Sequence, residues 1–132
     1  MVKSIKTTGK RKSAVARAVL KPGKGLVKIN NKLIDIYEPK MARLKLKEPL
    51  ILAGDVAKNA DISINVCGGG YMAQTEAARL ALAKALVKNT KRLEKVFLEY
   101  DRHLLVADVR RKETHKPNTH GKARAKRQKS YR

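Results

Sequence analysis

The sequence predicts an α+β fold: a small single domain in which a β-hairpin and a mixed sheet are packed by helices, with a long basic C-terminal extension. Two observations predict the domain. Apolar and polar residues alternate in short runs before residue 31 and again near residue 64, which is the period of half-buried strands. Two later segments have helical composition or helical apolar spacing. The 132 residues leave room for one such domain.

The first predicted strand covers residues 13–20, where small apolar residues alternate with others and Arg17 falls on the outer face. Residues 21–25 read Lys-Pro-Gly-Lys-Gly, a sequence that fixes one φ angle and then offers glycines for positive φ. The chain can therefore reverse there into residues 26–30, which alternate in the same way. We expect these two runs to pair as a β-hairpin with a basic outer side.

A short helix is expected from Pro39 to Lys47. Pro49 should break it, because proline cannot continue the ladder of backbone hydrogen bonds. Residues 61–67 alternate cleanly between apolar and polar side chains and predict a half-buried strand, which the following run of three glycines ends.

A long helix is predicted over residues 71–88, which are rich in Ala and Leu and contain neither Gly nor Pro. Its alanines permit a close approach to a sheet. A second helix is expected to begin near Thr90, a suitable N-cap residue. The apolar face of that helix follows the i, i+3, i+4, i+7 spacing: Leu93, Val96, Phe97 and Tyr100.

The domain is expected to occupy residues 1–109 and the C-terminal extension residues 110–132. Beyond Val109 no aliphatic residue is larger than Ala. Such a segment buries too little apolar surface to offset the entropy of ordering, so we expect it to be a disordered arm when the protein is alone.

Positive charge is concentrated at the two ends of the chain. Thirty-two Lys and Arg against eleven Asp and Glu give a net charge of +21. Residues 1–28 hold nine of the cations and no acid, and residues 110–132 hold ten with Glu113 as their one acid. A merely solvated surface usually mixes both signs. The nearly pure blocks therefore predict a polyanionic partner such as a nucleic acid.

Residues 7–13 (Thr-Thr-Gly-Lys-Arg-Lys-Ser) place three consecutive cations beside a glycine and three hydroxyls, directly before a strand. These groups suit phosphate oxygens, because cations supply charge while hydroxyls and a backbone N–H supply hydrogen bonds. The alternative is a solvated basic loop. A nucleotide-binding P-loop is not supported, because no Gly-Lys pair is followed by Ser or Thr.

The glycine run at residues 68–70 leads from a strand into a helix, where free N–H groups favour anions. Glycines at such turns are as often required for close packing of the backbone, and both interpretations stay open. Gln74 and Arg79, in the first turns of the helix, would reach the same partner as the glycines.

Catalytic and metal-binding patterns are weak. Cys67 is the one cysteine, so an internal disulfide and a cysteine-based zinc site are excluded. The acids show no catalytic spacing, and we expect no enzyme activity, cofactor, metal or small-molecule substrate. No segment resembles a membrane span or a secretory signal, so a cytoplasmic protein without a membrane partner is expected.

The predicted strands contain no aromatic residues, so base stacking is not the expected mode of binding. The remaining mode of binding is recognition of the phosphate backbone of folded RNA or of DNA. A DNA-compacting chromosomal protein is the alternative from another class, and a nucleotide-phosphate transferase that uses the glycine run is the enzymatic one.

Four motifs occur together in order. They are Thr-Gly-Lys-Arg-Lys-Ser-Ala-Val-Ala-Arg-Ala at residues 8–18, Pro-Gly-Lys-Gly at 22–25, Asn-Val-Cys-Gly-Gly-Gly at 65–70 with Gln74, and Ala-Arg-Ala-Lys-Arg-Gln-Lys-Ser-Tyr-Arg at 123–132. On these motifs the chain resembles the universal small-subunit ribosomal protein nine family over essentially its whole length. The ending Gln-Lys-Ser-Tyr-Arg is similar to the archaeal and eukaryotic branch.

The resemblance implies a structural constituent of the small ribosomal subunit with an unusual left-handed βαβ crossover. It implies binding to small-subunit rRNA in the subunit head, beside neighbouring ribosomal proteins, and a tail that reaches the peptidyl site. There Lys129, Ser130 and Arg132 would contact tRNA. The residues expected to bind rRNA are Thr8, Gly9, Lys10, Arg11, Lys12, Arg17, Gly69, Gly70, Gln74, Arg79, Arg110, Arg111, Lys112, Lys116, Lys122, Arg124, Lys126 and Arg127.

Overall fold

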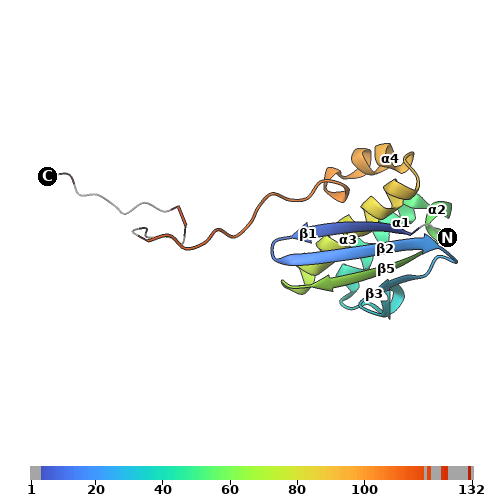
Figure 1. Ribbon diagram of the computed structural model, residues 1–132, viewed down its shortest axis with the longest axis horizontal. Coiled ribbons are helices and arrows are strands. Elements are labelled where there is room, and N and C mark those ends of the chain that lie inside the picture. The colour runs from blue at the N-terminus through green and yellow to red at the C-terminus, as the bar shows by residue number, and fades with distance from the viewer. Residues whose placement is uncertain (1–3, 118, 120–122, 125–130, 132) are drawn as a thin grey trace.

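A computed structural model describes residues 4–117, 119, 123, 124 and 131. It confirms the α+β class, with a mixed open sheet and helices (Figure 1). The strands are β1 (Ile5–Arg11), β2 (Ala14–Pro22), β3 (Val27–Ile29), β4 (Lys32–Leu33) and β5 (Ala60–Cys67). The α-helices are α1 (Lys40–Ala53), α2 (Asp55–Lys58), α3 (Tyr71–Asn89) and α4 (Leu93–Tyr100), with short 3-10 turns η1 (Ile34–Ile36) and η2 (Arg102–Leu104).

The five strands are ordered β1-β2-β5-β3-β4. β2 pairs antiparallel with β1 and with β5, whereas β3 pairs parallel with β5 and antiparallel with β4. The parallel pair is joined through α1 and α2, so the chain crosses over between β3 and β5.

The predicted hairpin between residues 13–20 and 26–30 is wrong, because β5 lies between these two runs. β2 instead pairs with β1 around a tight turn at Lys12, whose φ is 52°. Residues 5–11 also alternate, but Thr7 and Gly9 take the inward positions, so no apolar period was visible there. The turn at 21–25 is held beside the start of β5, where the Asp61 carboxylate accepts the N–H groups of residues 24 and 26 at 2.8 and 2.9 Å.

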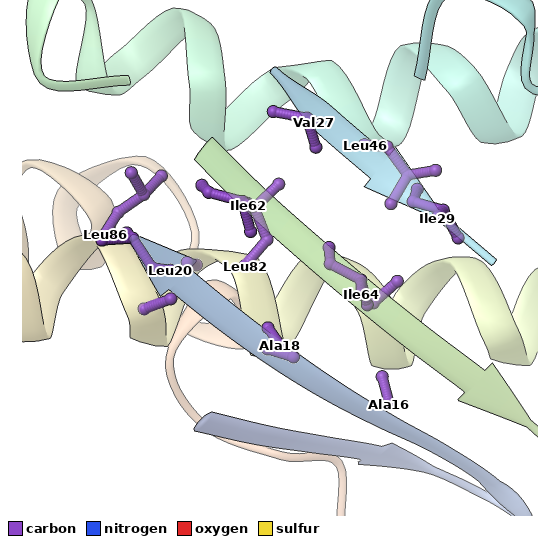
Figure 2. Close-up of a cluster of buried hydrophobic side chains, with 14 of the residues drawn as sticks. Ala16, Ala18, Leu20, Val27, Ile29, Leu46, Ile62, Ile64, Leu82 and Leu86 are labelled. Carbon is purple, nitrogen blue, oxygen red and sulfur yellow. The ribbon is translucent and has the colours of Figure 1, made fainter. Parts of the chain in front are cut away.

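The core lies between one face of the sheet and the helices, as Figure 2 shows for ten labelled side chains. α3 packs across β1, β2 and β5, and α1 packs against α3. The inward residues of β2 and β5 are buried as their alternation predicts. They are Ala14, Ala16, Ala18 and Leu20 on β2, and Ile62, Ile64 and Val66 on β5.

β1 lies unusually close to the backbone of α3. The Thr7 hydroxyl donates to the Ala81 carbonyl at 2.7 Å. A Cβ atom added at Gly9 would lie 2.1 Å from the Ala77 carbonyl oxygen and 2.8 Å from the Ala81 nitrogen. Only glycine fits this position, so Gly9 is required by the packing of strand on helix.

Two helix boundaries differ from the prediction. α1 continues through Pro49 and ends at Gly54, whose φ is 56° and whose N–H bonds to the Leu50 and Ile51 carbonyls. Pro49 is fully buried, and this burial offsets the helical hydrogen bond that proline cannot make. The predicted break at Pro49 was therefore wrong.

α4 begins at Leu93 rather than near Thr90, which instead follows α3 and donates its N–H to the Leu86 carbonyl. Leu93 and Phe97 are buried as expected. The other two residues of the predicted face, Val96 and Tyr100, are 41% and 56% exposed, because α4 is short and packs through a narrow stripe.

Gly9→Ala should lower the free energy of unfolding by about 3 kcal/mol, because β1 and α3 must move apart to admit the methyl group. Gly70→Ala is the matched control, since nothing lies within 4 Å of a Cβ there and its φ is −87°. The control should change the free energy by less than about 1 kcal/mol. Urea denaturation measures both, and equal effects would contradict the close contact.

Candidate nucleic-acid interface

The β1–β2 hairpin end brings together part of the predicted phosphate site. Thr8 and Arg17 are register partners and, with Lys10, are exposed on the face of the sheet that α3 does not cover. Lys12 is exposed at the turn itself. These side chains are placed as the phosphate-binding interpretation requires, whereas Gly9 faces the helix.

Arg11 points away from that face into ion pairs. Its Nε lies 2.6 Å from Glu76 Oε2, its Nη1 pairs with Asp108, and its side chain is 15% exposed. Burial alone would raise the pKa of Glu76, but hydrogen bonds and charge from Arg11 and Lys45 outweigh it and lower the pKa below its ordinary value. The Lys45 Nζ lies 3.4 Å from Glu76 Oε1, so the carboxyl stays ionised. Arg11 therefore joins β1 to α3 and to the segment after η2, and its charge is already neutralised inside the domain.

Arg79 has the same internal role. Its Nη2 lies 2.5 Å from Glu48 Oε2 and 3.0 Å from Asp101 Oδ2, and the side chain is 13% exposed. Burial raises the pKa of Asp101, but the His103 N–H and Arg79 lower it below its ordinary value. The sequence placed Arg79 near the glycine run, but pairing with residues 31 positions earlier and 22 later could be seen only in the fold.

The glycine run packs against the hairpin end, so the structure brings two predicted motifs together. Gly68 and Gly69 have φ angles of 76° and 68°, and a Cβ on Gly68 would lie 2.6 Å from the Ser13 carbonyl oxygen. Close packing of the backbone, together with positive φ, therefore requires glycine at these two positions. Gly70 begins α3 with open space around it, and the Gln74 side chain donates to the Gly68 carbonyl at 3.1 Å.

The start of the tail is fixed beside the same hairpin. Asp108 accepts the Arg110 N–H at 2.8 Å and also pairs with the guanidinium groups of Arg110 and Arg11. Hydrogen bonds from Arg110, followed by the charge of Arg11, hold the pKa of Asp108 well below its ordinary value. Arg111 donates to the Lys12 carbonyl at 3.0 Å. Residues 105–117 contain no helix or strand.

The remaining predicted residues of the tail divide into two groups. Lys112 is exposed, Lys116 lies 3.9 Å from Glu113, and Arg124 forms an ion pair with Glu113. The others lie outside the described residues: Lys122, Lys126, Arg127, Lys129, Ser130 and Arg132.

Three cations on the uncovered face were not among the predicted contacts. Lys6, Lys21 and Lys28 are exposed and share this face with Arg17, because each occupies an outward position of its strand. The strand alternation that predicted Arg17 as outward applies equally to Lys21 and Lys28, so it could have identified both.

A depression of about 240 Å³ lies where Arg11, Arg79 and Asp108 meet, and its charges are mixed. Three carboxylates line it and are engaged with arginines, which makes it a poor site for a free nucleotide. Among the described residues no three His, Cys, Asp or Glu side chains are grouped to hold a metal ion. No helix in that part of the chain is long and apolar enough to cross a membrane.

A one-sided sheet with uncompensated cations on its free face, at its hairpin end and at the start of its tail defines a small basic protein of the polyanion-binding class. The family model described as ribosomal protein S9/S16 matches residues 9–132. The chain belongs to this ribosomal protein family.

Curated relatives match along the whole chain. Proteins named small ribosomal subunit protein uS9 from Methanococcus maripaludis strains C7 and S2 are each 51% identical over 134 residues. The protein of that name from strain C5 is 50% identical. Each alignment covers 99% of this chain and 100% of the relative, and together they identify the archaeal-type form of the family.

Arg79→Gln should lower the free energy of unfolding by about 2 kcal/mol, because Glu48 and Asp101 lose a partly buried cation. It should leave the affinity for rRNA unchanged. The matched control, Lys112→Gln, removes an exposed cation and should leave stability unchanged while reducing the salt dependence of binding by about one unit of slope. Denaturation and filter binding measure the two effects, and loss of affinity in Arg79→Gln would assign it a direct contact.

Proposed function

We propose that this protein is a non-catalytic structural constituent of the small ribosomal subunit that binds and stabilises rRNA of the subunit head. The observation that carries the proposal is the way the charges are paired. Glu76, Asp101 and Asp108 are engaged with arginines of the domain and the start of the tail. Lys10 and Lys12 stay exposed at the hairpin end, where phosphate oxygens can reach them.

Family membership supports rRNA and neighbouring ribosomal proteins as the partners. The proposal includes the left-handed crossover that the family implies for β3 and β5, and a domain boundary near residue 109 with a long basic tail beyond it. Because Arg111 donates to the Lys12 carbonyl, the tail begins at the hairpin end, beside the proposed rRNA-contacting cations.

The proposal also includes a contact between the tail and tRNA in the peptidyl site through Lys129, Ser130 and Arg132. The motif at residues 123–132 supports it, because its basic and hydroxyl side chains suit phosphate oxygens.

Sedimentation of a cell extract tests the structural role. The protein should migrate with the small subunit at physiological salt and also at about 0.5 M salt, where exposed electrostatic contacts are largely screened. Immunoblotting of sucrose-gradient fractions follows it. Migration with DNA would favour a chromosomal protein, and recovery at the top of the gradient would contradict an integral ribosomal role.

Arg132→Ala should weaken tRNA binding in the peptidyl site without releasing the protein from the subunit. One exposed charge-assisted hydrogen bond contributes about 1 to 3 kcal/mol at most, so the contact modulates binding rather than creating it. Filter binding of tRNA to variant subunits measures the effect. Arg124→Ala is the control within the tail, since Arg124 is paired with Glu113. Unchanged tRNA affinity and decoding accuracy in Arg132→Ala would remove the tRNA role.

A further inference from the structure

The face of the sheet that the helices leave open is strongly basic. It is turned to the viewer in Figure 1, where α1 and α3 lie behind the strands. β1, β2 and β3 each place lysine or arginine at outward positions, while the inward residues of β2 and β3 are apolar. The exposed cations of this open face are Lys6, Lys10, Arg17, Lys21 and Lys28.

These cations have no ion-pair partner within the part of the chain that the structure describes. One acid, Asp61, occupies an outward strand position, but its carboxylate accepts the backbone N–H groups of Lys24 and Leu26. Those bonds hold its pKa below the ordinary value, so Asp61 stays charged, and it lines a hollow of the open face together with Lys21 and Lys28. With five cations and the one acid Asp61 among its described residues, the open face carries a net positive charge. The guanidinium groups of Arg11 and Arg79, in contrast, are paired with carboxylates.

Small polar side chains and two half-buried valines, Val15 and Val19, lie between the cations. Ser63 and Asn65 on β5 are exposed and lie opposite Val19 and Arg17 in the register. The described strands carry no aromatic side chain that could stack on a base. Such a surface suits phosphate and ribose groups rather than unstacked bases.

Exposed apolar side chains gather elsewhere. Met41, Leu44 and Ile51 on α1 are between 50% and 75% exposed. On the open face the large exposed apolar side chains lie at the β3–β4 edge, at Leu26 and Leu33, while the outward Val15 and Val19 of β2 are half-buried. Since the core of a protein interface is depleted in charge and rich in apolar groups, the open face is the less suitable of the two for a protein partner.

The cations are too widely spread for a single small anion. Lys6 and Lys10 are four residues apart on one strand, as are Arg17 and Lys21, which separates each pair by about 13 Å. A shallow hollow of about 370 Å³ lies over β2, β3 and β5, with Lys21 and Lys28 in its lining. This breadth matches an extended polyanion.

We propose that the open face docks the sugar–phosphate backbone of a double-helical segment of small-subunit rRNA. The proposal rests on the proposed function and extends its contact surface from the hairpin end, with which the open face shares Lys10, across β1, β2 and β3. Duplex RNA is read through its shape and its phosphate and 2′-hydroxyl groups, which a broad, basic, non-aromatic surface provides for.

Neutralising the face tests the proposal. The full chain carrying Arg17→Gln, Lys21→Gln and Lys28→Gln is compared with a matched control carrying Lys91→Gln, Arg92→Gln and Lys95→Gln, which removes the same charge from exposed positions at α4. The probe is protein-free small-subunit rRNA from Methanococcus maripaludis. The slope of log affinity against log salt concentration should become shallower by about 2 to 3 units for the open-face variant and by less than one unit for the control.

The outcomes separate this inference from the proposed function. If the unmodified chain does not bind the rRNA, the ribosomal proposal fails. If it binds and both triple variants lose the same slope, the open face is not a docking surface, while the ribosomal role stands. Equal affinity for duplex DNA of the same length would also overturn the assignment to RNA. Urea denaturation verifies that both variants are folded.

Cys67 provides a second test that needs no change to the face. It is the one cysteine of the chain, is exposed, and lies on β5 opposite Val15 of β2, whose other register partner is Lys10 of β1. An iron chelate tethered to Cys67 in reconstituted subunits should cleave both strands of one rRNA helix. The control places the chelate on α4 with Cys67→Ser and Lys95→Cys, and its cuts should fall elsewhere. Absence of rRNA cleavage from Cys67, or cleavage of a neighbouring protein instead, overturns the proposal.

Discussion

The ion pairs of Arg11 hold together the hairpin end, α3 and the start of the tail. Arg11 ends β1, and its guanidinium holds Glu76 of α3 and Asp108 of the segment that follows η2. Because Asp108 also accepts the Arg110 N–H, the same contact directs the chain where the tail begins. The hairpin end, the N-terminal half of α3 and the start of the tail are therefore adjacent, although Lys12 and Arg111 are 99 residues apart in sequence.

A chain with a net charge of +21 must fold against its own repulsion. The structure reduces this cost by placing two acids where cations approach from two parts of the chain: Glu76 pairs with Arg11 and Lys45, and Asp108 pairs with Arg11 and Arg110. Because these pairs lie near the helices, the open face keeps a single acid, Asp61, among its described residues, against five exposed cations. Binding of an external polyanion would then remove the remaining repulsion, so the distribution that stabilises the domain also prepares a binding surface.

Alternation in sequence was sufficient to predict β2, β5 and their buried faces, since each signal lies within a few consecutive residues. It failed for β1, where Thr7 and Gly9 face the helix and leave no apolar period. The motif at residues 7–13 assigned Arg11 to the nucleic-acid site, and proximity to the glycine run assigned Arg79, but the fold pairs both arginines internally. A local sequence shows that a residue is charged, but its partner is set by contacts across 22 to 97 residues.

The shortage of large side chains explains why one face of the sheet remains open. Gly9 lets β1 lie directly on the backbone of α3 at Ala77 and Ala81, and small residues of β2 extend the same thin core. The helices α1 and α3 bury this thin core from one side of the sheet. Among the described residues no helix covers the other side. Most outward strand positions are then polar, and the lysine and arginine side chains among them keep this face hydrated while attracting a polyanion. The aromatic-poor composition, the one-sided sheet and the basic open face thus follow from a single physical constraint.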